Sequence, residues 1–298
     1  MSPLSDTAVR PLIRLALRED RASADATSRA VVPVNLRIRA RIIAKAPGIL
    51  AGGPIALWTF QTIDPSLRCR LIQAEGARLV HGTTILTVEG RARSIMAAER
   101  TALNFLMHLS GIATLTRAFI DRTRGTHAKI FDTRKTLPGL RALEKYAVHL
   151  GGGYNHRANL ADAILIKKNH IQCWWKIWGP DSPQKDTGHG VLWALTSARS
   201  YPDTLIGVEV TKKHELRAIL NLSAKRMPHL ILLDNWRLAD IRRAVALRGG
   251  ARRPLLEVSG GVTLKNVRAI AKTGVDRISI GCLTHSAPAL DCSLIINP

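Results

Sequence analysis

Between residues 36 and 44, apolar side chains alternate with arginines. Successive side chains of a strand point to opposite faces, so this alternation predicts a half-buried strand. Short apolar segments such as residues 84–88 follow, separated by glycines, which is typical of strands joined by tight turns. Nearer the N-terminus, charged residues from Arg10 to Asp20 interrupt an apolar pattern, which predicts an amphipathic helix and not a secretory signal.

A long helix is predicted over roughly residues 93–122. Its apolar residues recur at helical spacing, at positions 98, 102, 105, 106 and 109. Arg100, Asn104 and His108 follow one another at every fourth position, so they share another face of the same helix.

After about residue 126 the pattern changes to short apolar runs that alternate with helical stretches. The runs predict strands at residues 129–131, 163–166, 207–210, 230–233, 255–258 and 277–280. Helices are predicted between them, near residues 140–150, 191–200, 212–225, 237–247 and 263–273. Alternating strands and helices indicate a parallel sheet, and this many units predict a closed or nearly closed barrel.

The stretch from about Gln172 to Gly190 carries three tryptophans, at positions 174, 175 and 178. Exposed aromatics beside Lys176 and Lys185 would suit an interaction patch. We favour the simpler interpretation, a variable surface loop over the barrel.

The composition is that of a water-soluble protein. Hydrophobic residues make up 46% of the 298, and no apolar run reaches the roughly 18 residues that a membrane span needs. We therefore expect a cytoplasmic protein with no membrane partner. The four cysteines are widely spaced, which predicts neither a disulfide framework nor a zinc site.

The net charge is +22, from 44 lysines and arginines against 22 acids. Such a charge attracts nucleic acid, anionic membranes or small polyanionic substrates. The basic residues are spread along the chain and form no tail or arm, so the charge alone does not choose among these partners.

Reactive side chains collect where the predicted strands end, which is where barrels of this kind build their active sites. The basic ones are Arg134, Lys135, His156, Arg157 and Lys167, with Arg141 and Lys145 just beyond. A pocket lined in this way fits a ligand with several negative charges. Among these cations, the acids Glu209 and Asp234 suggest a Mg²⁺ bridging the protein and a polyphosphate.

Two glycine-bearing segments, residues 259–262 and 280–285, follow the last two strands, where barrels commonly bind phosphate. Backbone N–H groups can approach an anion there.

Each feature also has a plainer explanation. An arginine after a strand can be a surface charge, Glu209 can be an edge residue in an ion pair, and residues 151–153 can be a helix stop.

Several motifs in this chain are recognisable together. The motif segments are residues 98–106, 109–114, 132–148, 151–157, 163–170, 208–210, 232–235, 259–262 and 279–288. In this order they resemble the signature of the quinolinate phosphoribosyltransferases, over about residues 9 to 295. The segment 132–148, Asp-Thr-Arg-Lys-Thr-Leu-Pro-Gly-Leu-Arg-Ala-Leu-Glu-Lys-Tyr-Ala-Val, is the most specific of these matches.

The resemblance implies an α/β fold, with an N-terminal open-faced α/β sandwich followed by an incomplete, TIM-like α/β barrel. We expect the sandwich at residues 1–112, the barrel at 113–286, and a C-terminal tail, 287–298, that returns to the sandwich. The resemblance also implies a homodimer with shared active sites, or a larger homo-oligomer. The implied enzyme is a pentosyltransferase of de novo NAD biosynthesis. It would convert quinolinate and phosphoribosyl pyrophosphate to nicotinate mononucleotide, CO₂ and pyrophosphate.

By the same resemblance, Arg134, His156, Arg157 and Lys167 would bind quinolinate, and Arg100 would reach in from a partner subunit. Lys135 and Lys167 would face the phosphoribosyl pyrophosphate. Glu209 and Asp234 would hold the ribose hydroxyls and Mg²⁺, and these two acids and two lysines form the expected catalytic set. The 5′-phosphate cradle would comprise Ser259, Gly260, Gly261, Gly281 and His285, and Thr133, Ile280 and Cys282 complete the expected substrate contacts. No organic cofactor is expected.

Three positions depart from the family pattern. Lys168 stands where an acid is usual, Gly207 replaces the first acid of the usual Glu-Val-Glu, and Ala24 replaces a glycine. Two alternatives therefore stay open: a related phosphoribosyltransferase for another small acid, and an inactive basic scaffold that binds nucleic acid. The transferase is the favoured hypothesis, and a nucleic-acid partner is not part of it.

Overall fold

The computed structural model describes residues 5–178, 189–201, 204–251 and 253–296. The chain forms two compact units. The first comprises residues 1–117, 137–152 and 282–298, and the second comprises residues 118–136 and 153–281. The sequence-based domain boundaries, at residues 112/113 and 286/287, stay a prediction beside this division.

The first unit contains a four-stranded antiparallel sheet in the order β12-β1-β5-β3. Its strands are β1 (Arg37–Ala44), β3 (Arg68–Leu71), β5 (Thr84–Arg91) and β12 (Cys292–Ile296). The last strand of the chain therefore lies beside the first, with Ile42 opposite Leu294. A short pair, β2 (Gly48–Ile49) and β4 (Arg78–Leu79), adds a second small sheet.

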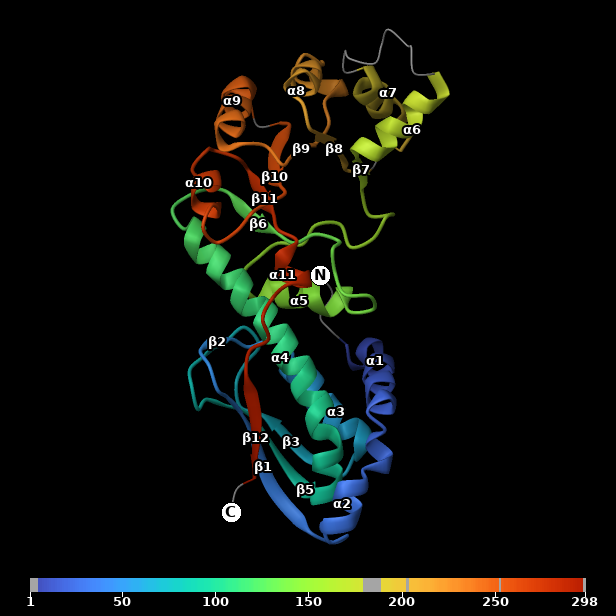
Figure 1. The fold of residues 1–298 in the computed structure, drawn as a ribbon, viewed down its shortest axis with the longest axis vertical. Helices are drawn as coiled ribbons and strands as arrows, with labels where there is room; N and C mark the ends of the chain where they lie inside the picture. Colours follow the sequence, from blue (N-terminus) through green and yellow to red (C-terminus); the bar gives the residue numbers. More distant parts are fainter. Residues whose placement is uncertain (1–4, 179–188, 202–203, 252, 297–298) are drawn as a thin grey trace. The chain divides into compact units, whose positions relative to one another are not determined.

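Helices of the first unit cover one face of this sheet (Figure 1). The covering helices are α3 (Gly53–Ile63) and α4 (Ala92–Thr123), whose start at residue 92 confirms the predicted long helix. Their apolar residues, such as Phe60 and Leu106, share a core with Ile42 and Val88 of the strands. The unit also contains α1 (Asp6–Glu19), η1 (Ala22–Ala24), α2 (Ala26–Val31), α5 (Arg141–Leu150) and α11 (Cys282–His285).

A glycine in α4 marks a close approach within this unit. A Cβ at Gly111 would lie 2.1 Å from the carbonyl oxygen of Pro288. Two residues further on, the N–H of Leu290 donates to the carbonyl of Met107. Backbone packing against the C-terminal segment thus explains the glycine of the helix motif.

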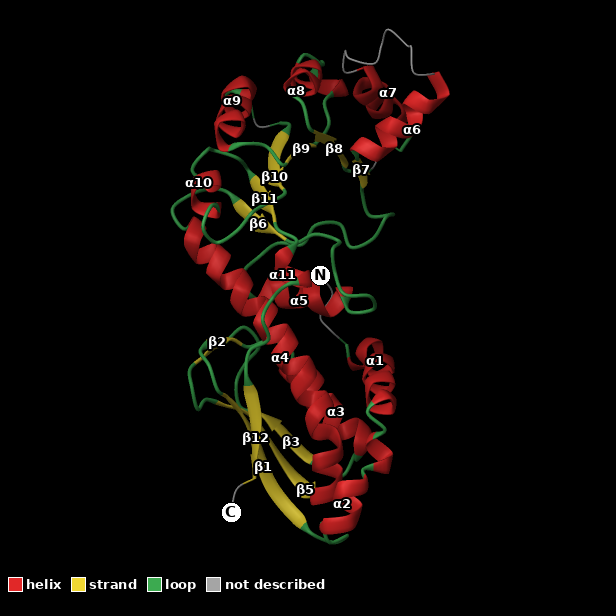
Figure 2. Cartoon of the chain, in the orientation of Figure 1, coloured by secondary structure: helices red, strands yellow, loops and turns green. Residues whose placement is uncertain are grey.

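The second unit is built on a six-stranded parallel sheet in the order β6-β11-β10-β9-β8-β7 (Figure 2). The strands are β6 (Lys129–Phe131), β7 (Ile164–Ile166), β8 (Ile206–Val210), β9 (Leu230–Asp234), β10 (Leu255–Ser259) and β11 (Arg277–Ser279). Each lies within a residue of its predicted range. Among the described residues β6 and β7 are edge strands and do not pair, so the barrel is incomplete, as predicted.

Helices connect these strands. They are α6 (Lys168–Trp178), α7 (His189–Ala198), α8 (Lys213–Leu220), η2 (Ala224–Arg226), α9 (Leu238–Arg248) and α10 (Val267–Ala271). The prediction of a loop from residue 172 was wrong up to Trp178, because α6 continues through it. Residues 179–188 and the tryptophan side chains of α6 lie outside the described residues. No helix in the described part of the chain is long and apolar enough to cross a bilayer.

Candidate active site

The register of the parallel sheet places four of the predicted site residues on one face. Glu209 pairs with Leu232, two residues before Asp234, and Asp234 pairs with Ser259. Paired residues and every second residue share a face, so Glu209, Asp234 and Ser259 project together from the carboxyl ends of β8, β9 and β10. Lys167 continues this face just beyond β7, since Leu165 pairs with Gly207. The site predicted at the strand ends therefore has a common surface on which to form.

The turn after β10 has a backbone shape suited to an anion. Gly260 and Gly261 both have positive φ, 87° and 61°. A Cβ at Gly260 would lie 2.1 Å from Oδ1 of Asn235, whose own N–H donates to the carbonyl of Ser259. Asn266 accepts from Thr263 N–H and donates to the Gly261 carbonyl, 2.8 and 2.9 Å, so side chains fix the whole turn. Glycine is needed at both positions for this conformation.

Two arginines in the second unit, Arg134 and Arg157, interact electrostatically. Burial lowers the pKa of Arg157, and the positive charge of Arg134 lowers it further, while Asp162 opposes the shift. Arg157 donates from Nη1 to the carbonyl of Ala163, 2.7 Å, which holds its side chain. The Nε of Arg134 is buried without a hydrogen-bond partner in the described part of the chain. Paired guanidinium groups that repel each other, one with a free donor, suit a ligand with neighbouring carboxylates.

A buried acid lies beside His156. Glu257, in the middle of β10, has a fully buried side chain, and its Oε1 lies 3.5 Å from Nε2 of His156. The ring Nδ1 of His156 accepts the backbone N–H of Arg157 at 2.9 Å, and the backbone N–H of His156 donates to Oδ1 of buried Asp132 at 2.7 Å. These contacts hold the loop that carries Arg157 against β10 and against Asp132, which directly follows β6.

The sequence analysis named neither Glu257 nor Asp132 as a candidate site residue, although both contact His156. Burial raises the pKa of Glu257 to about 7, with a smaller contribution from the negative charge of Asp132. The hydroxyl of Ser279 and the charge of Arg277 oppose this shift. The sequence did contain a signal for Glu257, which lies inside the apolar run Leu-Leu-Glu-Val. An acid at such a position either faces solvent or is buried beside a partner.

Each of the two candidate metal ligands has one carboxylate oxygen that accepts no hydrogen bond from the described residues. Oε1 of Glu209 accepts the N–H of Lys168 at 3.4 Å, and Oδ2 of Asp234 accepts from the Asn235 amide at 2.9 Å. No group of three or more histidine, cysteine or acidic side chains suited to a metal occurs among the described residues. Two carboxylates with open oxygens match the way Mg²⁺ is bound together with substrate phosphates. β8 lies between β7 and β9, so Glu209 is not an edge residue.

The remaining predicted site residues fall in both units. In the second unit, the Thr133 hydroxyl accepts the N–H of Lys135 at 3.0 Å, and the N–H of Ile280 donates to Phe131. Gly281 follows Ile280 directly. Arg100, Cys282 and His285 belong to the first unit, as do Arg141 and Lys145.

Two glycine positions are clarified by packing. A Cβ at Gly207 would meet Leu165 at 3.0 Å and Leu230 at 3.6 Å. These leucines therefore fill the space that the side chain of the usual acid would need at position 207. Gly151 ends α5, and its Cβ would meet the Ala113 carbonyl at 2.5 Å. The glycine run at 151 is therefore a helix stop, one of the two interpretations left open.

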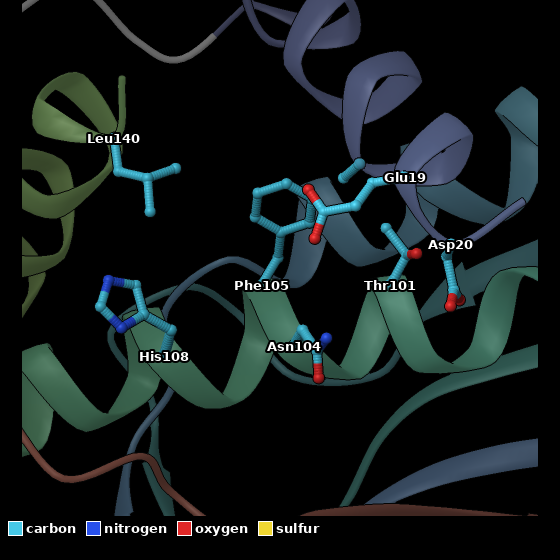
Figure 3. A pocket seen from close by; sticks show the side chains of 8 residues that line it. Glu19, Asp20, Thr101, Asn104, Phe105, His108 and Leu140 are labelled. Atoms are coloured by element: carbon cyan, nitrogen blue, oxygen red, sulfur yellow. The ribbon is translucent and has the colours of Figure 1, made fainter. Parts of the chain in front are cut away.

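The first unit has a pocket of its own, of about 280 Å³, between α1 and α4 (Figure 3). Asn104 and His108 line it, but Arg100, which shares their helix face, does not. Glu19 and Asp20 lie at its other side (Figure 3), and Nε2 of His108 is 3.0 Å from the buried Glu144.

The likeness of the chain to known proteins agrees with this geometry. Residues 25–110 match the family described as quinolinate phosphoribosyl transferase, N-terminal domain, and residues 112–295 match its C-terminal domain. The chain belongs to the quinolinate phosphoribosyltransferase family. The family and the fold class predicted from the sequence are thereby confirmed.

Relatives resemble the chain over nearly its whole length. A Mycobacterium leprae protein named nicotinate-nucleotide pyrophosphorylase [carboxylating] is 43% identical, with 96% of each chain covered. A Nicotiana tabacum protein named quinolinate phosphoribosyltransferase [decarboxylating] 1b is 38% identical over 97% of this chain and 82% of its own length. The crystal structure of NadC from Streptococcus pyogenes superposes with a TM-score of 0.87 at 35% identity and covers both chains completely.

Proposed function

We propose that this chain transfers the phosphoribosyl group of phosphoribosyl pyrophosphate to quinolinate and releases CO₂. Membership of the family supports this reaction, and one structural observation carries it. The strand ends of the second unit present Lys167, Glu209 and Asp234 on one face, and the same unit carries Arg134 and Arg157, whose positive charges act on each other. The same unit thus carries two arginines suited to the carboxylates of quinolinate and a lysine and two acids suited to a ribose polyphosphate and its metal ion.

In the proposed reaction the pyridine nitrogen of quinolinate attacks the anomeric carbon as the bond to pyrophosphate breaks. Arg134 and Arg157 hold the carboxylates and so orient the nitrogen, which is how positioning lowers the barrier. Lys135 and Lys167 stabilise the negative charge that develops on the departing pyrophosphate. The new pyridinium ring then accepts the electron pair of the adjacent carbon–carboxylate bond, CO₂ leaves, and a proton takes its place.

We propose Glu209 and Asp234 as the ligands of Mg²⁺ brought with phosphoribosyl pyrophosphate. Bound there, the ion would neutralise charge on the leaving group. Their adjacent strands and open oxygens support this assignment. The backbone N–H of Lys168 donates to Glu209. The side chain of Lys168 stands where the family pattern has an acid, so this chain has one carboxylate fewer beside Glu209.

We further propose a homodimer in which Arg100 of one subunit serves the site of the other. Two observations agree with a role outside its own subunit's pocket. Arg100 is exposed, and it does not line the cavity to which its helix neighbours Asn104 and His108 contribute.

The test of the proposed function is a product assay. Purified protein with quinolinate, phosphoribosyl pyrophosphate and Mg²⁺ should form nicotinate mononucleotide and pyrophosphate in equal amounts. Nicotinate in place of quinolinate should give no product, because it offers one carboxylate to two arginines. Turnover of nicotinate but not of quinolinate would refute the proposal, and so would an intact protein that binds both substrates without turnover.

A further inference from the structure

The open face of the first unit's sheet is the feature that the proposed function does not use. Helices α3 and α4 cover the other face (Figure 1). Strand alternation directs Ile38, Ala40 and Ile42 of β1 into that covered core. The arginines that alternate with them, Arg37, Arg39 and Arg41, therefore point outward.

Strand register gathers further arginines around these three. Arg37 lies opposite Arg91, Arg39 opposite Glu89, and Arg41 opposite Thr87 on β5. Across β5, Arg68 lies opposite Glu89 and Arg70 opposite Thr87 on β3. We call these six exposed arginines the arginine face; they are Arg37, Arg39, Arg41, Arg68, Arg70 and Arg91.

The arginine face is almost free of compensating charge. Glu89 is the one acid in these paired rows, and it accepts from Nε of Arg39 at 3.0 Å. Six arginines and one glutamate leave five positive charges. The surface is hollowed rather than flat, with a depression of about 370 Å³ lined by Arg39, Arg68, Arg70 and Glu89.

The spacing of these charges is regular. Outward side chains recur about every 6.8 Å along a strand, and neighbouring strands lie about 4.8 Å apart. Guanidinium groups bind phosphate oxygens through two parallel donors and keep their charge at every physiological pH. A grid of this kind matches a ligand that presents phosphates in regular rows.

We propose that the arginine face binds double-stranded nucleic acid through its phosphates, without regard to base sequence. Charge complementarity over an unpartnered sheet face carries the proposal. The paired rows offer no aromatic side chain on which the bases of a single strand could stack. A bilayer surface would need an extended apolar side to insert. Residues 37, 39 and 41 of β1 and their partners on β5 are charged or hydroxyl-bearing, and Ile295 of β12, opposite Arg41, is an exposed apolar side chain at their border. A second copy would bring the same positive charges against themselves.

The test measures binding of a labelled DNA duplex of about 20 base pairs by fluorescence anisotropy at several salt concentrations. The variant Arg41→Gln/Arg68→Gln/Arg70→Gln removes three charges from the face. The control Arg217→Gln/Arg226→Gln/Arg242→Gln removes three exposed arginines of the second unit. Each phosphate contact contributes about 0.9 to the slope of log affinity against log salt, so the face variant should lose about three from that slope.

At about 0.15 M salt the face variant should bind on the order of 100-fold more weakly, and the control within about threefold of wild type. Glu89→Gln should bind more tightly than wild type, a gain that misfolding cannot produce. Equal losses in both triple variants would overturn the proposal, because binding would then follow net charge and not this face. Preference for vesicles of anionic lipid over the duplex at the same salt would also overturn it.

Discussion

Replacing Glu257 by glutamine should make the protein more stable at alkaline pH and leave it unchanged in acid. The carboxyl group is fully buried; Nε2 of His156 lies 3.5 Å from its Oε1, and the Ser279 hydroxyl and the charge of Arg277 lower its pKa by less than burial raises it. Burial raises its pKa from an ordinary 4.5 to about 7. The folded protein therefore favours the protonated form, and ionising the group inside the barrel costs free energy.

The sign and size follow from proton linkage. A raised pKa stabilises the folded state below about pH 4.5, and that stability is lost as the pH rises through about 7. The rise from 4.5 to about 7 corresponds to about 3 kcal/mol in full, of which about 2.5 kcal/mol is lost between about pH 5 and pH 8. Glutamine has nearly the same shape and cannot ionise, so the variant should escape this loss.

The assay is urea unfolding followed by circular dichroism at about pH 5 and pH 8, at one protein concentration. Relative to wild type, Glu257→Gln should gain about 2 to 3 kcal/mol between the two pH values. The exposed carboxylate of Glu19 provides the matched control, and Glu19→Gln should change the difference by less than about 0.5 kcal/mol. If Glu257→Gln follows wild type at both pH values, the carboxylate is compensated in the folded state and the reasoning is wrong.

Three further results are expected. Arg134→Ala should weaken quinolinate binding by about 1.5 to 3 kcal/mol in calorimetry, since a charge-assisted contact is lost, and an unchanged affinity would remove this arginine from the pocket. Lys168→Asp should lower the Mg²⁺ concentration for half-maximal binding of phosphoribosyl pyrophosphate, because a carboxylate replaces a cation beside Glu209; no change in the metal titration would contradict that. Mixing inactive Arg100→Ala with inactive Lys135→Ala protein should restore about one quarter of wild-type activity, since half of the dimers regain one intact shared site. No recovery after verified subunit exchange would place both residues in the same subunit's site.

Local pattern was sufficient to predict most of the fold. The alternation at residues 36–44 and the six short apolar runs form strands within a residue of their predicted ranges. The spacing of apolar residues along the chain reflects which face of a strand is buried, so this spacing alone predicts the strand. The exception is the stretch from Gln172 to Trp178, which we predicted as a loop and which forms the later part of α6. The helix predicted near 263–273 is also shorter, Val267–Ala271, because residues 263–266 form a turn that the side chain of Asn266 fixes.

The candidate site residues could be named from the sequence, but which of them lie near one another in space could not. The motifs pointed to Arg134, Arg157, Glu209 and Asp234, while the repulsion between the two arginines and the shared face of the two acids depend on strand register. Register is a long-range property, because it is set by which strands become neighbours. The buried position of Glu257 beside His156 belongs to the same class.

The sequence alone determined the elements, the family and the list of charged side chains. Only the tertiary structure decided which of those charges are neighbours. Arginines scattered between residues 37 and 91 gave no basic tail or arm, yet sheet pairing collects six of them on one face. Electrostatic energy depends on distance in space and not on separation along the chain, so composition gives the total charge and folding gives its effect.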